Sequence, residues 1–170
     1  MTDQIQFYAP TILGIQEGLL HQIEYIKETL KDYEYLGVGR DDGEKKGEYC
    51  ALFYNKKQLT TKQIGTFWLS QTPEIPSKDW DAALPRICTY ALFSSGKNEF
   101  WVFNTHFDHL GRIARLASSK LILTEMARIN KQNHAAILMG DFNALEHEPP
   151  IQWITKKYLD SRYSARHFFG

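Results

Sequence analysis

The sequence predicts an α/β sandwich, in which two β-sheets pack face to face and helices cover their outer faces. Three observations predict this class. Strand-like and helical patterns follow one another in the order strand, helix, several antiparallel strands, helix, strand. The composition, 43% hydrophobic and 24% charged over 170 residues, suits one soluble domain with a sizeable core. No repeat or linker divides the chain, so we interpret residues 1–170 as a single domain.

The first half of the chain begins with helical patterns and continues as short strands. Residues 3–8 are typical of the end of a helix, which Pro10 terminates. Residues 18–31 predict an amphipathic helix, because one face collects Leu19, Leu20, Ile23, Ile26 and Leu30. Runs rich in β-branched and aromatic residues predict strands at 11–16, 33–39, 48–54 and 63–69. A polar, glycine-containing turn is expected at 40–47.

The second half opens with a long loop at 70–85 that contains three prolines, and loops of this length are often functional. A β-hairpin follows, with strands at 86–93 and 99–106. In the second strand the side chains that point to one face and those that point to the other are both apolar. We therefore expect this strand to be covered on both faces. A helix is expected at 109–131, with an inward face of Leu110, Ile113, Ala114, Ala117, Leu121 and Ile129. The last elements are a strand at 135–140 and a short helix at 149–157 that starts with proline.

Charge and cysteine content narrow the classes of function. Twenty basic residues balance twenty acidic ones, so no global positive field favours non-specific DNA binding as the main role. Cys50 and Cys88 lie in apolar runs and are expected to be small buried hydrophobes, although one bridge between them stays possible. The sequence shows neither a membrane-length apolar stretch nor a signal peptide. We expect a cytoplasmic protein by default, although a missing N-terminus could have carried a signal.

Polar groups follow the ends of three predicted strands, where sheet proteins usually bind ligands. These strand ends are Gln16–Glu17, Asn104–His109 and Gly140–Asn143. If they converge, one mouth holds carboxylates, an imidazole and amides, a set that suits a hard cation such as Mg²⁺ and a phosphate. Glu17 is the candidate metal ligand; its alternative role is a carboxylate favoured by the positive end of a helix dipole.

The other candidate residues have similar pairs of interpretations. His106 could donate a hydrogen bond to a phosphoryl oxygen, or be a satisfied histidine at a strand end. Asp141 and Asn143 could orient a water molecule, or form an Asx turn that leads to the helix beginning at Pro149. The candidate substrate-binding residues are Arg40, Arg86, Asn104, Asp108 and Arg112, and for the arginines the alternative is a solvated position on the surface.

Together these motifs resemble the endonuclease/exonuclease/phosphatase family, the deoxyribonuclease-I-like metal-dependent phosphoesterases. The matching strings are ILGIQE (12–17), NTHFDH (104–109) and ILMGDFNA (137–144), and their order and spacing are more specific than GDFN alone. The resemblance covers nearly the whole chain and is similar to a bacterial branch. It implies a four-layer α-β-β-α sandwich and Mg²⁺ or Mn²⁺ on Glu17. It also implies that His106 contacts the scissile phosphate, and that Asp141 and Asn143 position the attacking water.

The chain also departs from the family pattern. The family begins with a strand ending in a metal-binding asparagine and finishes with strands that carry an Asp and an Asp-His pair, but this chain starts at Met1 after the first and stops at Gly170 before the last. We therefore expect an incomplete sandwich with open sheet edges, and an inactive or weakly active fragment of a hydrolase. The alternative is a non-catalytic binding module that keeps the fold. The substrate class stays open among nucleic acid, nucleotide, lipid and sugar phosphates, as does the oligomeric state.

Overall fold

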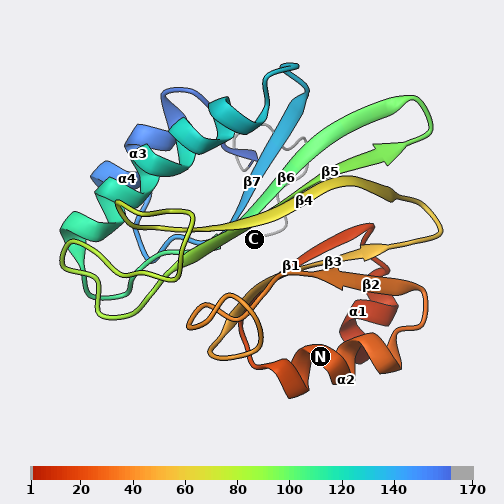
Figure 1. Cartoon of the computed structure of the whole chain (residues 1–170). Helices are drawn as coiled ribbons and strands as arrows, with labels where there is room; N and C mark the ends of the chain where they lie inside the picture. Colours follow the sequence, from red (N-terminus) through yellow and green to blue (C-terminus); the bar gives the residue numbers. More distant parts are fainter. Residues whose placement is uncertain (1, 162–170) are drawn as a thin grey trace.

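Two β-sheets face each other in the computed structural model, which describes residues 2–161, and helices cover the outer face of each sheet (Figure 1). In this part of the chain the first sheet has the order β1-β3-β2, with strands Ile12–Gly18, Tyr49–Asn55 and Tyr33–Leu36. The second has the order β4-β5-β6-β7, with strands Thr60–Trp68, Ile87–Ser95, Asn98–His106 and Ala135–Asp141. The first sheet carries the helices α1 (Thr2–Tyr8) and α2 (Leu20–Thr29), and the second carries α3 (Arg112–Ile129) and α4 (Pro149–Thr155). This arrangement confirms the predicted α/β sandwich.

Apolar side chains fill each of the three spaces between the layers. Ile23 and Ile26 of α2 pack on Phe53 of the first sheet. The space between the two sheets contains Leu52, Ala91, Phe93 and Val102. Helix α3 contributes Ile122 and Met126 to a cluster with Trp101 and Phe103. Because consecutive residues of β6 join different clusters, this strand is covered on both faces, as predicted.

Strands β6 and β7 run parallel, and α3 forms the crossover between them. Their register pairs His106 with Asp141 and Thr105 with Gly140. Gly140 has a φ of +140°, and a Cβ atom there would lie 1.9 Å from the carbonyl oxygen of Thr105. Only glycine allows this approach, which brings the ends of the two strands together.

The predicted inward face of α3 is wrong at its first turn. Leu110 and Ile113 are 66% and 64% exposed. Carboxylates from outside the helix set its start: Asp108 accepts hydrogen bonds from the N–H groups of Leu110 and Gly111, and Asp81 accepts those of Ile113 and Ala114. The buried face that results mixes polar and apolar residues: Ala114, Arg115, Ser118, Ser119, Ile122, Leu123, Glu125 and Met126.

Both cysteines are buried and free, as the apolar runs around them indicated. Burial raises the pKa of Cys50 to about 12 and the pKa of Cys88 well above its ordinary value. Neither thiol is therefore a nucleophile at neutral pH. Among residues 2–161, every helix is too short or too polar to cross a membrane.

Candidate functional site

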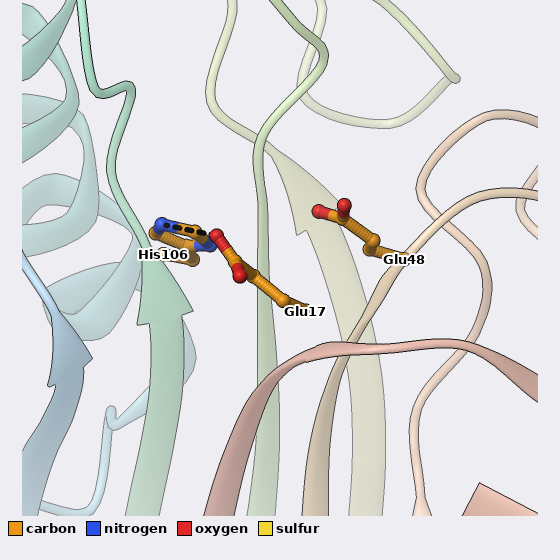
Figure 2. A group of neighbouring side chains, drawn as sticks. All are labelled: Glu17, Glu48 and His106. Carbon is orange, nitrogen blue, oxygen red and sulfur yellow. Dashed lines mark ion pairs between the residues drawn. The ribbon is translucent and has the colours of Figure 1, made fainter. Parts of the chain in front are cut away.

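Polar residues from both sheets meet at one end of the sandwich. Ligand atoms of Glu17, Glu48 and His106 all lie within 4.8 Å of one another. Figure 2 shows Glu17 and His106 pointing toward each other, with the Glu48 carboxylate turned toward the same space. The Nε2 atom of His106 is 3.8 Å from Glu17 Oε1 and 3.9 Å from Asp141 Oδ2. The convergence of strand ends that the sequence indicated is therefore present in the structure.

The backbone of β1 is distorted where it presents Glu17. The register with β3 shifts between Ile15 and Gly18, and Glu17 has a φ of +58°. A left-handed backbone is uncommon for a residue other than glycine, and β-bulges of this kind often redirect a side chain beside a functional site. Asn143 has a φ of +44°, so two residues that approach Nε2 of His106 both carry this strain.

Glu48 is a member of the cluster that the sequence alone did not identify. It directly precedes β3, whose first residue Tyr49 pairs with Gly18 at the end of β1. The antiparallel pairing therefore brings Glu48 beside Glu17. In the sequence, Glu48 is visible only as a carboxylate directly before an apolar strand. This pattern indicates a place in the site only when β1 and β3 are known to be neighbours.

Arg40, an expected substrate-binding residue, is buried behind this cluster. Its Nη1 atom donates to Glu48 Oε2. The Arg40 carbonyl oxygen accepts a hydrogen bond of 2.7 Å from the indole N–H of Trp68. Arg40 therefore holds Glu48 in place and balances its charge.

The imidazole of His106 is almost fully enclosed and lies between Arg86 and Asn143. The Nη1 atom of Arg86 is 3.1 Å from its Nδ1, and the Nδ2 atom of Asn143 is 3.0 Å from its Nε2. Burial, followed by the nearby charge of Arg86, lowers the pKa of His106, although Asp141 and Glu17 oppose the shift. These surroundings favour the neutral ring at neutral pH.

For Asp141 and Asn143 the sequence left two interpretations open, an Asx turn and polar groups that face the site, and the structure contains both. The backbone N–H of Asn143 donates to Asp141 Oδ1 over 2.8 Å, which is an Asx turn. The other carboxylate oxygen, Oδ2, is the atom that faces His106. The Asn143 amide also donates to the carbonyl oxygen of Phe107 over 3.0 Å. The turn thus fixes the positions of two polar groups at the mouth of the site.

Three of the other candidate substrate-binding residues are buried and already bonded. Asn104 donates to the carbonyl oxygens of Ile15 and Ala51, and so links the two sheets. Asp108 is almost fully buried and accepts from Arg86 Nε over 3.3 Å. A substrate would have to break these bonds to reach either side chain or Arg86. Arg112 is exposed at the start of α3, and no hydrogen bond or ion pair within the described residues joins it to the cluster.

A cavity of about 10 Å³ lies between the cluster residues. Its polar lining comes from Glu17, Glu48, His106, Arg40 and Arg86. A cavity of about this size accommodates one water-sized particle. Two carboxylates around such a space are oxygen donors of the kind that Mg²⁺ and Mn²⁺ prefer, so the residues present fit a single hard cation.

The fold and the cluster together define an α/β sandwich whose strand ends carry an acidic and imidazole site. A model of the Endonuclease/Exonuclease/phosphatase family matches residues 1–170, and the chain belongs to this family. The resemblance noted in the sequence is thereby confirmed.

Solved structures of bacterial proteins are similar to this chain. A mannosyl-6-phosphatase of Bacteroides thetaiotaomicron is 42% identical, with a TM-score of 0.89 over 92% of this chain and 60% of that one. A functionally unknown conserved protein of Enterococcus faecalis is 34% identical, with a TM-score of 0.89 over 95% of this chain and 64% of that one.

An uncharacterized protein of Acanthamoeba polyphaga mimivirus is 32% identical over 130 residues, which are 71% of this chain and 47% of that protein. The chain thus spans about half of its curated relative and less than two thirds of these structures.

Proposed function

We propose that this chain carries catalytic groups of a metal-dependent phosphoesterase, which cleaves a phosphate ester bond with an activated water molecule. One observation carries the proposal: Glu17, Glu48 and His106, from three different strand ends, line one small polar cavity, and Asp141 lies 3.9 Å from His106. Carboxylates and an imidazole gathered in this way add nothing to apolar packing, and charged groups are rarely brought together at a partly buried position without a ligand or a partner. Membership of a family that contains phosphatases and nucleases supports the same reaction class.

The carboxylates of Glu17 and Glu48 would hold Mg²⁺ or Mn²⁺. When bound, such a cation supplies positive charge that stabilises the negative charge developing on the phosphoryl and leaving oxygens. Arg40 donates to Glu48 and keeps its carboxylate oriented toward Glu17. The bulge in β1 does the same for Glu17.

The remaining residues would bind the phosphoryl group and the water. His106 faces the mouth through Nε2, which suits a hydrogen bond to a phosphoryl oxygen. Asp141 is exposed at the mouth, so its free oxygen can orient or deprotonate a water molecule. Asn143 would hold that water or a phosphate oxygen.

We propose a sugar phosphate as the first substrate class to test. The related Bacteroides structure at 42% identity is described as a mannosyl-6-phosphatase. The balanced charge of the chain also disfavours a long polyanionic substrate such as DNA. The alternative function, a non-catalytic module with the same fold, predicts ligand binding without turnover.

Calorimetric titration with Mg²⁺ and Mn²⁺ tests the metal site. We expect binding by the wild-type chain and its loss in Glu17→Gln and Glu48→Gln, because each substitution removes one ligand charge. Glu44→Gln is the matched control, since Glu44 is exposed in the adjacent turn and lies outside the cluster. Metal binding that survives both cluster substitutions would contradict the assignment.

Phosphate release from mannose 6-phosphate, compared with that from a dinucleotide, tests the reaction. We expect metal-dependent release from the monoester, which His106→Ala lowers by about 100-fold or more. Metal binding with no release from either substrate would favour the non-catalytic module.

A further inference from the structure

His106 faces a hydrogen-bond donor at each of its ring nitrogens. Arg86 approaches Nδ1 at 3.1 Å, and a guanidinium group can only donate. Asn143 Nδ2 approaches Nε2 at 3.0 Å, and its role as a donor is fixed because it also donates to the carbonyl oxygen of Phe107. A neutral imidazole accepts at one nitrogen and donates at the other. Only one of the two donors can therefore donate to the ring. The nitrogen that accepts from it carries no proton, and this determines the tautomer.

Arg86 is the more firmly held of the two donors. Its side chain is buried, and its Nε atom donates to Asp108, a carboxylate that is itself fixed by backbone N–H groups. Its Nη2 atom lies 2.9 Å from Nδ1 of His109, so each branch of the guanidinium has a partner. Asn143, by contrast, belongs to a half-buried turn at the mouth of the site. A charged donor in a buried network also binds more strongly than a neutral amide.

We propose that Arg86 is a positioning residue that fixes His106 in the tautomer with its proton on Nε2. The ring then presents an N–H group to the mouth formed by Glu17 and Asp141. This role rests on the proposed function, in which that N–H meets a phosphoryl oxygen. An imidazole that binds a metal through Nε2 carries its proton on Nδ1 and donates it to an acceptor, and Arg86 offers none. Arg86 therefore also keeps His106 a hydrogen-bond donor and prevents it from acting as a metal ligand.

The positioning role differs from the phosphate contact that the sequence suggested for Arg86. A direct contact with substrate phosphate predicts that loss of Arg86 raises KM. A positioning role predicts that kcat falls and KM changes little, because the altered group acts on the transition state through His106.

Nitrogen-15 NMR of the histidine side chains, in the full chain without metal or substrate, tests the proposal. His106→Gln assigns the signals, and the spectra are recorded at mildly alkaline pH, where the rings are neutral. In the wild type we expect His106 to show a protonated Nε2 and an unprotonated Nδ1. In Arg86→Met, which removes the donor and keeps an apolar stem, we expect the proton to move to Nδ1, because Asn143 then donates to Nε2. Arg86→Lys restores a charged donor and should restore the wild-type pattern.

Arg115→Met is the control for loss of a buried arginine. Arg115 is buried near Arg86 and donates to the carbonyl oxygen of Asp108, but it does not contact His106. The tautomer of His106 should be unchanged in this variant. A protonated Nδ1 in the wild type, or an unchanged tautomer in Arg86→Met, overturns the proposal. If Arg86→Met does not fold, the wild-type spectrum and Arg86→Lys still decide the question. Failure of the proposed function would appear in the metal and turnover assays and leave this measurement unaffected.

Discussion

At the scale of single residues, Asp108 connects the end of the sandwich that holds His106 with the long loop before β5. Burial alone would raise its pKa, but hydrogen bonds from the N–H groups of Gly111, Ala83, Leu110 and Leu84 hold the pKa well below its usual range. The same carboxylate binds Arg86. The ionised form of Asp108 is therefore a structural requirement of the site.

We expect Asp108→Asn to lower the free energy of unfolding by about 3 kcal/mol at neutral pH, because buried donors lose a charged acceptor. Asp has a pKa of about 3.9 in an unfolded chain, and the folded pKa of Asp108 is lower. Its stabilisation is therefore fully present above the unfolded pKa and is lost as the pH falls through the folded pKa. Urea unfolding of wild type and variant should show the difference shrinking below about pH 4.

Asp79→Asn is the control for this comparison, because Asp79 lies in an exposed loop and accepts from the N–H of Gln71. This substitution should lower the free energy of unfolding by less than about 1 kcal/mol. A loss as small as this in Asp108→Asn would contradict the structural role.

The residue scale also shows how far the sequence could predict the site. Glu17, His106, Asp141 and Asn143 were found because each stands at the end of an apolar strand. Glu48 stands at the beginning of one, and only the pairing of β3 with β1 gives it a neighbour. Arg86 was expected to bind substrate, with a solvated surface position as the alternative, but its charge is satisfied by Asp108, which is too distant in sequence for a local pattern to indicate.

At the scale of secondary-structure elements, the parallel pair β6 and β7 sets the distance between the strings NTH (104–106) and GDFN (140–143) of this chain. The φ of Gly140 and the close approach of Thr105 require glycine in this ladder. The order of strands was predicted well, because alternation and turn residues are local signals. The buried face of α3 was predicted poorly, because Arg115 and Ser119 satisfy their polar groups locally and occupy positions that apolar residues usually hold.

Gly140→Ala should destabilise the protein by about 3 kcal/mol or more, since the new methyl group meets a backbone oxygen that cannot move freely. Gly96→Ala is the matched control: its φ is +61°, but a Cβ atom there meets nothing within 4 Å. The control should cost only about 1 kcal/mol, the penalty of the left-handed backbone. Thermal unfolding of both variants gives the comparison, and equal losses would show that the close contact with Thr105 is unimportant.

At the scale of the whole molecule, strand β7 lies at an edge of the second sheet and is incompletely covered by the other residues between 2 and 161. Ile137 pairs with Val102 and so points toward the space between the sheets, yet it is 51% exposed. A groove of about 680 Å³ with a largely apolar lining follows β7 and α4, and another of about 550 Å³ lies between α1 and β1. Open, apolar strand edges of this kind promote association between chains.

We expect Ile137→Lys to reduce concentration-dependent association, because a charge on an edge strand opposes pairing with a second chain. Light scattering after size-exclusion chromatography measures the mass of the two proteins across a concentration series. Ile64→Lys, at an exposed position on edge strand β4, is the control for a general gain in solubility. Equal behaviour of the two variants would show that β7 has no special role in association.

The direct pairing of His106 with Asp141 has a consequence for how this chain can change its length. Both residues are held by the β6–β7 ladder, so the connection through residues 107–134 does not fix their spacing. Residues can be gained or lost in the turn between α3 and β7 while the two side chains keep their relative positions. A single insertion within β6 or β7 instead shifts one partner by one register step and turns it to the opposite face of the sheet. Natural variation in length should therefore collect in the crossover and be absent from the strands.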